Sequence, residues 1–320
     1  MSAATRGTVV VAGSVHIDLI ASATRMPGLG DSVTGTSFVT APGGKAANQA
    51  CQIVRCGLDV VLVGKIGNDQ HGAFLRRRLE EAGISTRYLT ADSVHPTGTS
   101  TVLAVGGEYA SIIVPGAAAQ LTSAEIDAVC TSIENPVALV MQLELPVSTV
   151  TVAARSAAKR GMLVVLNASP VPERSETIPE ALWESTDLLM VNRAEAKRLL
   201  GERHGGRRPE DIARELVTAS GVGTVVITLG AEGIVAMDNG SVIEQAAFPA
   251  SVVDSIGAGD AFLGTFVAGI IEGRTTDEAM RRAAAAGAIA VQGRGALDSI
   301  PAAAQIDAFL ERHPRPLIDR

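Results

Sequence analysis

The residues best suited to chemistry lie in one stretch, residues 253–264, which reads VDSIGAGDAFLG. The small residues at 257–259 let backbone N–H groups approach an anion, and the helix expected from Ala261 onward directs its positive dipole end to the same place. Asp260 would stand beside that anion, with a carboxylate oxygen free to accept the proton of an attacking hydroxyl. This arrangement favours phosphoryl transfer, in which positioning dominates catalysis. In isolation, an aspartate after a glycine-rich turn is more often a helix N-cap, so the rest of the chain must decide.

A second polar stretch, PGGKAANQA at residues 42–50, could bind hydroxyls or phosphate. Gly43 and Gly44 predict a tight turn that permits close backbone approach. Lys45 and Asn48 follow at the start of an expected helix, and their ammonium and carboxamide groups supply hydrogen-bond donors. The stretch is not a Walker A loop, because GxxxxGK[ST] is absent. A turn with an ordinary helix cap explains this segment about as well.

Other polar residues follow the apolar runs that predict strands. Asp18 ends the segment AGSVHID, and the strand end MQLELP is expected to expose Gln142 and Glu144. Carboxylates at the mouths of parallel strands can accept paired hydrogen bonds from vicinal diols. Two further strand ends, NRAE at residues 192–195 and ITLGAEG at 227–233, indicate strand-to-helix crevices in which a nucleotide would lie. Singly, each acidic residue is more often a cap or a solvated charge.

The elements that must position these residues alternate along the chain. Short apolar runs bounded by Gly, Asn or Pro predict strands buried on both faces, at residues 8–12, 60–63, 137–143, 162–166, 188–191 and 224–229. Helical periodicity occupies residues 46–56, 71–82, 123–132, 147–160, 193–200, 209–219, 259–272, 277–291 and 303–312. The alternation predicts an α/β fold, a three-layer α/β/α sandwich with a mostly parallel central sheet and ligands at the carboxyl ends of its strands.

Two segments interrupt this alternation. Residues 16–41 and 97–114 alternate polar and apolar side chains, and Gly106-Gly107 in the second segment predicts a hairpin. We expect the two segments to form a small β lid that excludes water from the site. Residues 1–15, 42–96 and 115–320 would then form the core that binds nucleotide and substrate.

Composition excludes several classes of protein. The chain has 320 residues, of which 47% are apolar and 19% charged, as in ordinary globular proteins. A net charge of −7 without charge blocks, together with two Tyr and one Trp, predicts no nucleic-acid partner. No run of about eighteen apolar residues predicts a membrane span. Three scattered cysteines fit a reducing, cytoplasmic compartment, and the five histidines lack metal-ligand spacing.

In their order, these stretches resemble the PfkB carbohydrate kinase family, and within it the ribokinase-like members. The likeness runs over nearly the whole chain, and residues 43–67 and 254–265 match the two family signatures. Other matching segments are GSVHIDLI, TGTSTVLAVGGE, MQLELP, LNASPVP, VNRAEAKRLLG, VITLGAEG and GRGALDSIP. The resemblance implies a kinase that transfers the γ-phosphoryl group of ATP to a primary sugar hydroxyl, with D-ribose giving D-ribose 5-phosphate as the first expectation.

The resemblance also implies roles for individual residues. Asp260 would be the catalytic base, beside an anion hole formed by Gly257, Ala258 and Gly259. The sugar would contact Asp260 and, in addition, His16, Asp18, Gly44, Lys45, Asn48 and Glu144. The nucleotide would contact Asn192, Thr228, Gly230, Gly233 and Gly259.

The same resemblance implies metal ions and a partner subunit. Glu195 would organise Mg²⁺ through water. A monovalent cation, usually K⁺, would lie among residues that contribute mostly backbone carbonyls, namely Asp254, Ile256, Ala290, Gly293, Gly295 and Ser299. The β lid would join two subunits in a homodimer.

Three positions depart from the family pattern. His16 stands where ribokinase-like members usually carry an asparagine that contacts the sugar, and imidazole is bulkier. Ala284 replaces a polar residue often found near the adenine, and Thr265 is unusual within the second signature. His16 leaves open a different pentose, a keto-hexose, a sugar acid or a nucleoside as acceptor. A sugar sensor without turnover is the alternative of another class, and the presence of Asp260, the glycine turn and Asn192 together argues against it.

Overall fold

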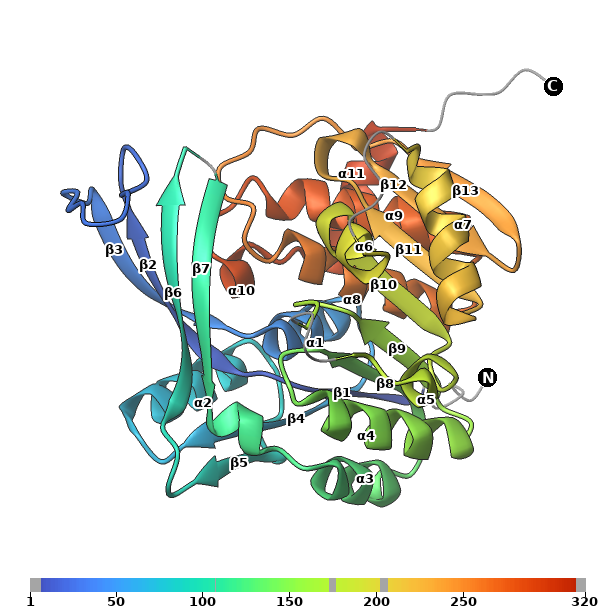
Figure 1. Cartoon of the computed structure of the whole chain (residues 1–320), viewed down its shortest axis with the longest axis horizontal. Coiled ribbons are helices and arrows are strands. Elements are labelled where there is room, and N and C mark those ends of the chain that lie inside the picture. Colours follow the sequence, from blue (N-terminus) through green and yellow to red (C-terminus); the bar gives the residue numbers. More distant parts are fainter. Residues whose placement is uncertain (1–6, 107, 173–176, 202–206, 315–320) are drawn as a thin grey trace.

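A computed structural model describes residues 7–106, 108–172, 177–201 and 207–314 of the chain. Its centre is a nine-stranded sheet in the order β13-β12-β11-β10-β9-β8-β1-β4-β5 (Figure 1). Neighbours from β11 to β5 pair in parallel, while β12 and β13 pair antiparallel at one edge. The strands are β1 (Thr8–Ala12), β4 (Val60–Gly67), β5 (Leu89–Asp92), β8 (Pro136–Gln142), β9 (Leu163–Asn167), β10 (Leu188–Asn192), β11 (Thr224–Thr228), β12 (Ile234–Asp238) and β13 (Ser241–Gln245).

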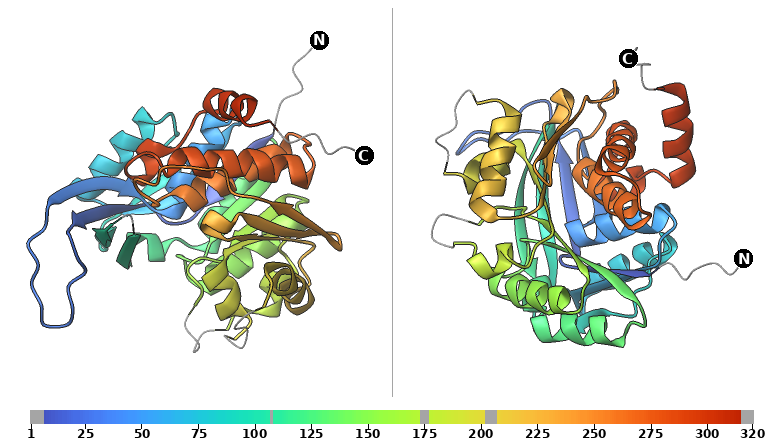
Figure 2. Two further views of the ribbon diagram at one scale, coloured as in Figure 1. Left: turned by 90° about the horizontal axis from the view of Figure 1, so that it is seen from above. Right: turned by 90° about the vertical axis from the view of Figure 1, so that its right-hand side faces the viewer.

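Helices cover both faces of this sheet, which confirms the predicted α/β sandwich (Figure 2). One face carries α1 (Lys45–Arg55), α2 (Gln70–Glu81), α8 (Ala258–Ile271), α9 (Thr276–Ala290) and α10 (Ala296–Ser299), with α11 (Ala303–Arg312) packed outside α9. The other carries α3 (Ser123–Ser132), α4 (Val147–Lys159), α5 (Glu180–Trp183), α6 (Arg193–Leu199) and α7 (Pro209–Ser220). No helix within the described ranges has the length and apolar character that crossing a bilayer would require.

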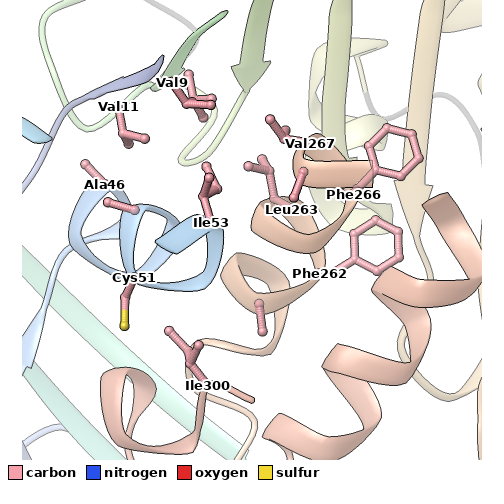
Figure 3. Close-up of a cluster of buried hydrophobic side chains, with 14 of the residues drawn as sticks. Val9, Val11, Ala46, Cys51, Ile53, Phe262, Leu263, Phe266, Val267 and Ile300 are labelled. Carbon is pink, nitrogen blue, oxygen red and sulfur yellow. The ribbon is translucent and has the colours of Figure 1, made fainter. Parts of the chain in front are cut away.

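The packing of α1 against α8 brings the two signature stretches together. Side chains of β1, α1 and α8 gather in one buried cluster that includes Val9, Ile53 and Leu263 (Figure 3). Gly264 permits the close approach of the two helices, because a Cβ at that position would lie 2.6 Å from the Cβ of Gln52. Both helices begin at the carboxyl-terminal edge of the sheet, so their first turns face each other there.

A second, four-stranded sheet has the order β3-β2-β6-β7. Its strands are β2 (His16–Ser22), β3 (Ser37–Gly43), β6 (Thr97–Val105) and β7 (Glu108–Gly116). The two segments predicted to leave the core therefore do pair with each other, through the parallel pair β2 and β6. The predicted hairpin joins β6 to β7, with Val105 opposite Glu108, and Gly107 lies outside the described residues.

The structure corrects one local prediction. Residues 227–233 do not lead from a strand into a helix: β11 passes through a single 3-10 turn (Gly230–Glu232) into the antiparallel strand β12. Neither β12 nor β13 was predicted: β13 is an edge strand that mixes polar and apolar residues, whereas β12 is a buried apolar strand in the place where a helix was expected to follow residues 227–233. Residues 227–233 need no helix because β11 and β12 are antiparallel neighbours, which a tight turn can join, whereas parallel neighbours need a crossover connection.

Candidate active site

Asp260 lies in the first turn of α8 and faces the first turns of α1. Its buried carboxylate accepts two hydrogen bonds, one from Asn48 Nδ2 to Oδ2 at 2.9 Å and one from Gln49 Nε2 to Oδ1 at 2.8 Å. The N-cap residue of α8 is Gly257, and within the described chain no side chain caps that helix. Asp260 is therefore not used as an N-cap, and its carboxylate is directed into the polar contacts at the sheet edge.

The turn before Asp260 leaves its backbone amides available. Gly257 has a φ of 80°, in the left-handed region, and a Cβ there would lie 2.7 Å from Ala296 Cα, so glycine is required. Ala258 N–H makes one long hydrogen bond, 3.3 Å to Ser255 O. Across the described residues, the amides of Gly259 and Asp260 have no backbone acceptor. Free amides at the start of a fourteen-residue helix suit an anion such as a phosphoryl group.

Glu144, just beyond β8, ties the start of α1 to the end of β1. Its carboxylate accepts hydrogen bonds from the Ser14 hydroxyl and, at 3.3 Å, from the backbone N–H of Lys45. Burial alone would lower the pKa of Lys45, but the charges of Glu144 and Asp260 outweigh burial and raise that pKa. Lys45 therefore stays protonated and brings a positive charge to a site that otherwise holds carboxylates.

His16 and Asp18 come from the small sheet and share one face of β2. Both side chains are buried, and His16 Nδ1 lies 3.2 Å from Asp18 Oδ1. Burial would lower the pKa of His16, but the carboxylates of Asp18 and Glu144 outweigh it and raise that pKa. The negative charge of Glu144 therefore raises the pKa of His16 on β2 as well as that of Lys45 on α1.

Asn48 presents an unused acceptor at this site. Its Nδ2 is bound to Asp260, whereas its Oδ1 is buried without a hydrogen-bond partner among the described residues. A buried carbonyl oxygen costs free energy unless something donates to it. A ligand hydroxyl would satisfy Asn48 Oδ1 while lying near the Asp260 carboxylate.

The residues expected to bind a nucleotide lie along two neighbouring strand ends. Asn192 closes β10 and pairs with Thr228, which closes β11. Gly230 begins the 3-10 turn that follows and Gly233 comes directly after it, and Arg193 contacts that turn through a 2.6 Å ion pair with Glu232. Among the described residues, no hydrogen bond joins these nucleotide-binding candidates to Gly259. They and the turn before Asp260 are separate parts of the structure.

Asn192 and Glu195 already serve a structural purpose. The side chain of Asn192 accepts the Glu195 N–H at 2.9 Å, and Glu195 Oε2 accepts the Asn192 N–H at 2.7 Å. This reciprocal capping box begins α6. Within the part of the chain that the structure describes, one carboxylate oxygen of Glu195 and the amide nitrogen of Asn192 remain for a ligand.

The residues expected around a monovalent cation form two adjoining loops. Asp254 joins them, because its carboxylate accepts the Ile256 N–H at 3.0 Å and the Gly295 N–H at 2.9 Å. Ala290 ends α9, Gly293 follows in the turn after it, and Ser299 ends α10. Since the Asp254 carboxylate holds the loops together, backbone carbonyls would supply most ligands to a cation there.

Two other positions depart from the family pattern, Ala284 and Thr265, and both side chains are buried in helices.

Sequence reasoning expected Gln142 to be exposed at a strand end, whereas it is fully buried, and it missed two further buried carboxamides beneath Asp260, those of Gln49 and Asn167. Gln49, Gln142 and Asn167 are linked by hydrogen bonds that reach from α1 to the ends of β8 and β9. The available signal was a polar residue closing each apolar strand, together with the second amide of the Asn48-Gln49 pair. Periodicity places Gln49 on the buried face of α1, and only the packing shows that Asp260 is its partner.

Comparison with known proteins identifies the architecture. A family model described as "pfkB family carbohydrate kinase" matches residues 6–303. Ribokinase from Haemophilus influenzae is 33% identical over 307 residues, which cover 96% of this chain and 99% of the relative. Deoxyribokinase from Salmonella typhi is 29% identical over 310 residues, with 94% and 98% coverage. The structure of Arabidopsis thaliana ribokinase complexed with ribose and ATP aligns with a TM-score of 0.83 at 29% identity, and it covers 95% of this chain and 99% of the other.

Proposed function

Because the chain belongs to the pfkB family of carbohydrate kinases, we propose that it phosphorylates D-ribose with ATP, giving D-ribose 5-phosphate and ADP. The observation that carries this proposal is the position of Asp260, whose buried carboxylate lies beside the free amides that begin α8. The full-length similarity to ribokinases and to the ribose- and ATP-bound relative supports both substrates.

The chemistry assigned to the site follows from this geometry. The primary hydroxyl oxygen of the sugar attacks the γ-phosphorus, the bond from that phosphorus to the β-phosphate oxygen breaks, and ADP leaves. Asp260 accepts the hydroxyl proton, while the amides of Gly257, Ala258 and Gly259 hold the charge that develops on the phosphoryl oxygens. Lys45 adds positive charge on the same side.

Sugar binding is assigned to residues from both sheets. Asp18 and Glu144 would accept hydrogen bonds from sugar hydroxyls, and Asn48 Oδ1 has the unsatisfied lone pairs to do the same. Gly44, the N-cap of α1, brings backbone close to the sugar, and Lys45 and His16 complete the set. We propose that residues 16–41 and 97–114 act as a lid over a core of residues 1–15, 42–96 and 115–320.

Nucleotide and metal ions are assigned to the other end of the sheet edge. Asn192, Thr228, Gly230 and Gly233 would contact the nucleotide, with Gly259 at the phosphates. Mg²⁺, held through water by the free oxygen of Glu195, would neutralise the phosphate oxygens when bound. K⁺ would lie among the carbonyls of the loops joined by Asp254, at Ile256, Ala290, Gly293, Gly295 and Ser299.

We further propose a homodimer formed through the lid. Strand register places Phe38, Ile112 and Val114 on one face of the small sheet, where they are 66%, 72% and 56% exposed. Exposed apolar side chains on one face of a sheet support an interaction surface there. A cytoplasmic location agrees with three cysteines that are all free thiols.

A coupled ADP-release assay with ATP, Mg²⁺ and K⁺ over a panel of sugars and nucleosides tests the proposal. Ribose should give the highest kcat/KM. Highest efficiency with another sugar, sugar acid or nucleoside would favour the alternative of the same mechanism with another acceptor, for which His16 is the specific observation. No ADP release with any acceptor would instead favour the sugar sensor.

A further inference from the structure

Among the described residues, Gln49 is the one fully buried side chain that donates a hydrogen bond to the Asp260 carboxylate. It lies on α1, one residue beyond Asn48, and its Nε2 is 2.8 Å from Asp260 Oδ1. The roles assigned above to Asn48, Lys45 and Glu144 all involve the sugar. Gln49 has no exposed surface from which to reach a ligand, so its contact with Asp260 calls for a separate explanation.

The orientation of the Gln49 carboxamide is determined by its neighbours. Gln142 Nε2 donates to Gln49 Oε1 at 2.7 Å, which requires that the amide nitrogen of Gln49 point the other way. That nitrogen donates to Asp260 Oδ1 and, at 3.2 Å, to Asn167 Oδ1. Asn167 Nδ2 in turn donates to Met190 O at 3.1 Å. The chain of amides thus begins at β8 and ends at β10, both central strands of the sheet.

Anchoring on three strands makes the donor to Asp260 rigid. Gln142 closes β8, Asn167 closes β9 and Met190 lies within β10, so the ladder of the sheet holds both amide partners of Gln49 and the acceptor of Asn167. Asn48, the other donor to Asp260, lacks such a frame and has an acceptor free for substrate. The two donors therefore differ: one is available to respond to a ligand, and the other is locked to the protein.

A locked donor favours the ionised carboxylate. An N–H group stabilises a charged oxygen more than a neutral one, and the effect is large where water is excluded. Burial raises the pKa of Asp260, whereas Lys45, Asn48 and Gln49 act to lower it and the charge of Glu144 acts to raise it. Lys45 and Glu144 are the charged groups that face Asp260, and both also take part in sugar binding as proposed.

We propose that Gln49 is a positioning residue, which fixes one oxygen of Asp260 and keeps its carboxylate charged, so that the other oxygen is presented to the substrate hydroxyl. This inference rests on the proposed role of Asp260 as the base. It assigns to the buried amides of Gln142 and Asn167 the task of holding Gln49 in its donating orientation.

The test replaces Gln49 by methionine, which has a similar length and no donor. In Q49M the acid limb of the kcat profile should move to higher pH by about one unit, since one hydrogen bond to a charged group is lost. At neutral pH, kcat should fall roughly tenfold while the KM for ATP stays within about twofold. Q142M, which frees Gln49 to rotate, should move the acid limb in the same direction by less.

The matched control is Q52M. Gln52 is equally buried on α1, but its Nε2 donates to Pro301 O at 3.1 Å and not to Asp260. The acid limb of the kcat profile of Q52M should coincide with that of the wild type. If Q49M and Q52M show the same acid limb, or if Q49M only lowers the melting temperature, Gln49 is structural and the inference is wrong.

A second readout does not need turnover. The ¹³C resonance of the Asp260 carboxyl, assigned by its loss in D260N after aspartate labelling, reports the titration of that carboxyl directly. In Q49M the midpoint should be higher than in the wild type, and an unchanged midpoint would overturn the inference. A wild-type protein that releases no ADP from any acceptor would contradict the proposed function, and the ¹³C titration would still decide the role of Gln49. Should Q49M not fold, Q142M carries both measurements.

Discussion

The Asp260 carboxylate and the Asn48 carboxamide, 212 residues apart in the chain, are joined by a hydrogen bond of 2.9 Å. The bond connects the first turns of α8 and α1, which hold the two stretches that match the family signatures. The bond therefore places Asp260, the proposed base, beside Asn48, which is proposed to bind the sugar, before any substrate binds. A hydroxyl that donates to Asn48 Oδ1 would lie within reach of Asp260.

Replacement of Asp260 by asparagine should lower kcat by about 10²–10⁴-fold, because asparagine keeps the shape of the side chain but cannot accept the hydroxyl proton. Nucleotide affinity, measured by calorimetry, should change little. The control is D307N, which removes an exposed carboxylate paired with Arg282 on a distant helix. Near-wild-type turnover in D260N would end the assignment of Asp260 as the base.

The pH dependence of kcat should reflect the raised pKa of Asp260. Burial is the main cause, and it lifts that pKa above the ordinary value of 3.8. Since the base must be ionised, kcat should fall as the pH falls through this raised pKa, and the acid limb should lie at a higher pH than 3.8.

Replacement of Lys45 by methionine removes a positive charge that lowers the pKa of Asp260, so the acid limb of K45M should lie at a higher pH than that of the wild type. A limb at or below the wild-type position in K45M would contradict this electrostatic account.

Exchange of His16 for asparagine should change the preference among acceptors. His16 is buried beside Asp18, so a smaller side chain with its own donor changes the space and the hydrogen bonds offered to a sugar. We expect kcat/KM for ribose to rise roughly tenfold relative to the other acceptors in the panel. The exposed His71, exchanged in the same way, serves as the control. An unaltered order of preference would mean that other residues determine selectivity.

Introduction of a charge on the outer face of the lid should separate the proposed dimer. In I112E a carboxylate replaces an apolar side chain that is 72% exposed, so the monomer should fold normally while the interface is lost. Sedimentation velocity should show a dimer for the wild type and a monomer for I112E. The control V94E alters a residue that is 81% exposed outside the small sheet and should remain dimeric. A wild-type chain that sediments as a monomer would exclude this interface.

Local patterns in the sequence predicted most of the fold. Apolar runs and helical periodicity identified the longer helices and every parallel strand of the large sheet except the short strand β5, because both features arise from which face of an element is buried. The NRAE segment did form the start of a helix, and its side chains do form a capping box. The edge strand β13 escaped prediction because half-exposed strands carry weaker patterns than buried ones, and β12, although buried, was missed because a helix was expected to follow β11.

The sequence by itself determined that a carboxylate with a glycine turn, and a lysine-asparagine pair, would each occur at the start of a helix, because turn chemistry and periodicity are properties of neighbouring residues. Only the tertiary structure decided what surrounds Asp260. The donation from Gln49 to that carboxylate, across 211 residues, depends on how closely α1 packs against α8 and on the amides of β8 and β9 beneath them. Contacts of that kind are determined by the packing of distant elements, which no pattern within a single segment encodes.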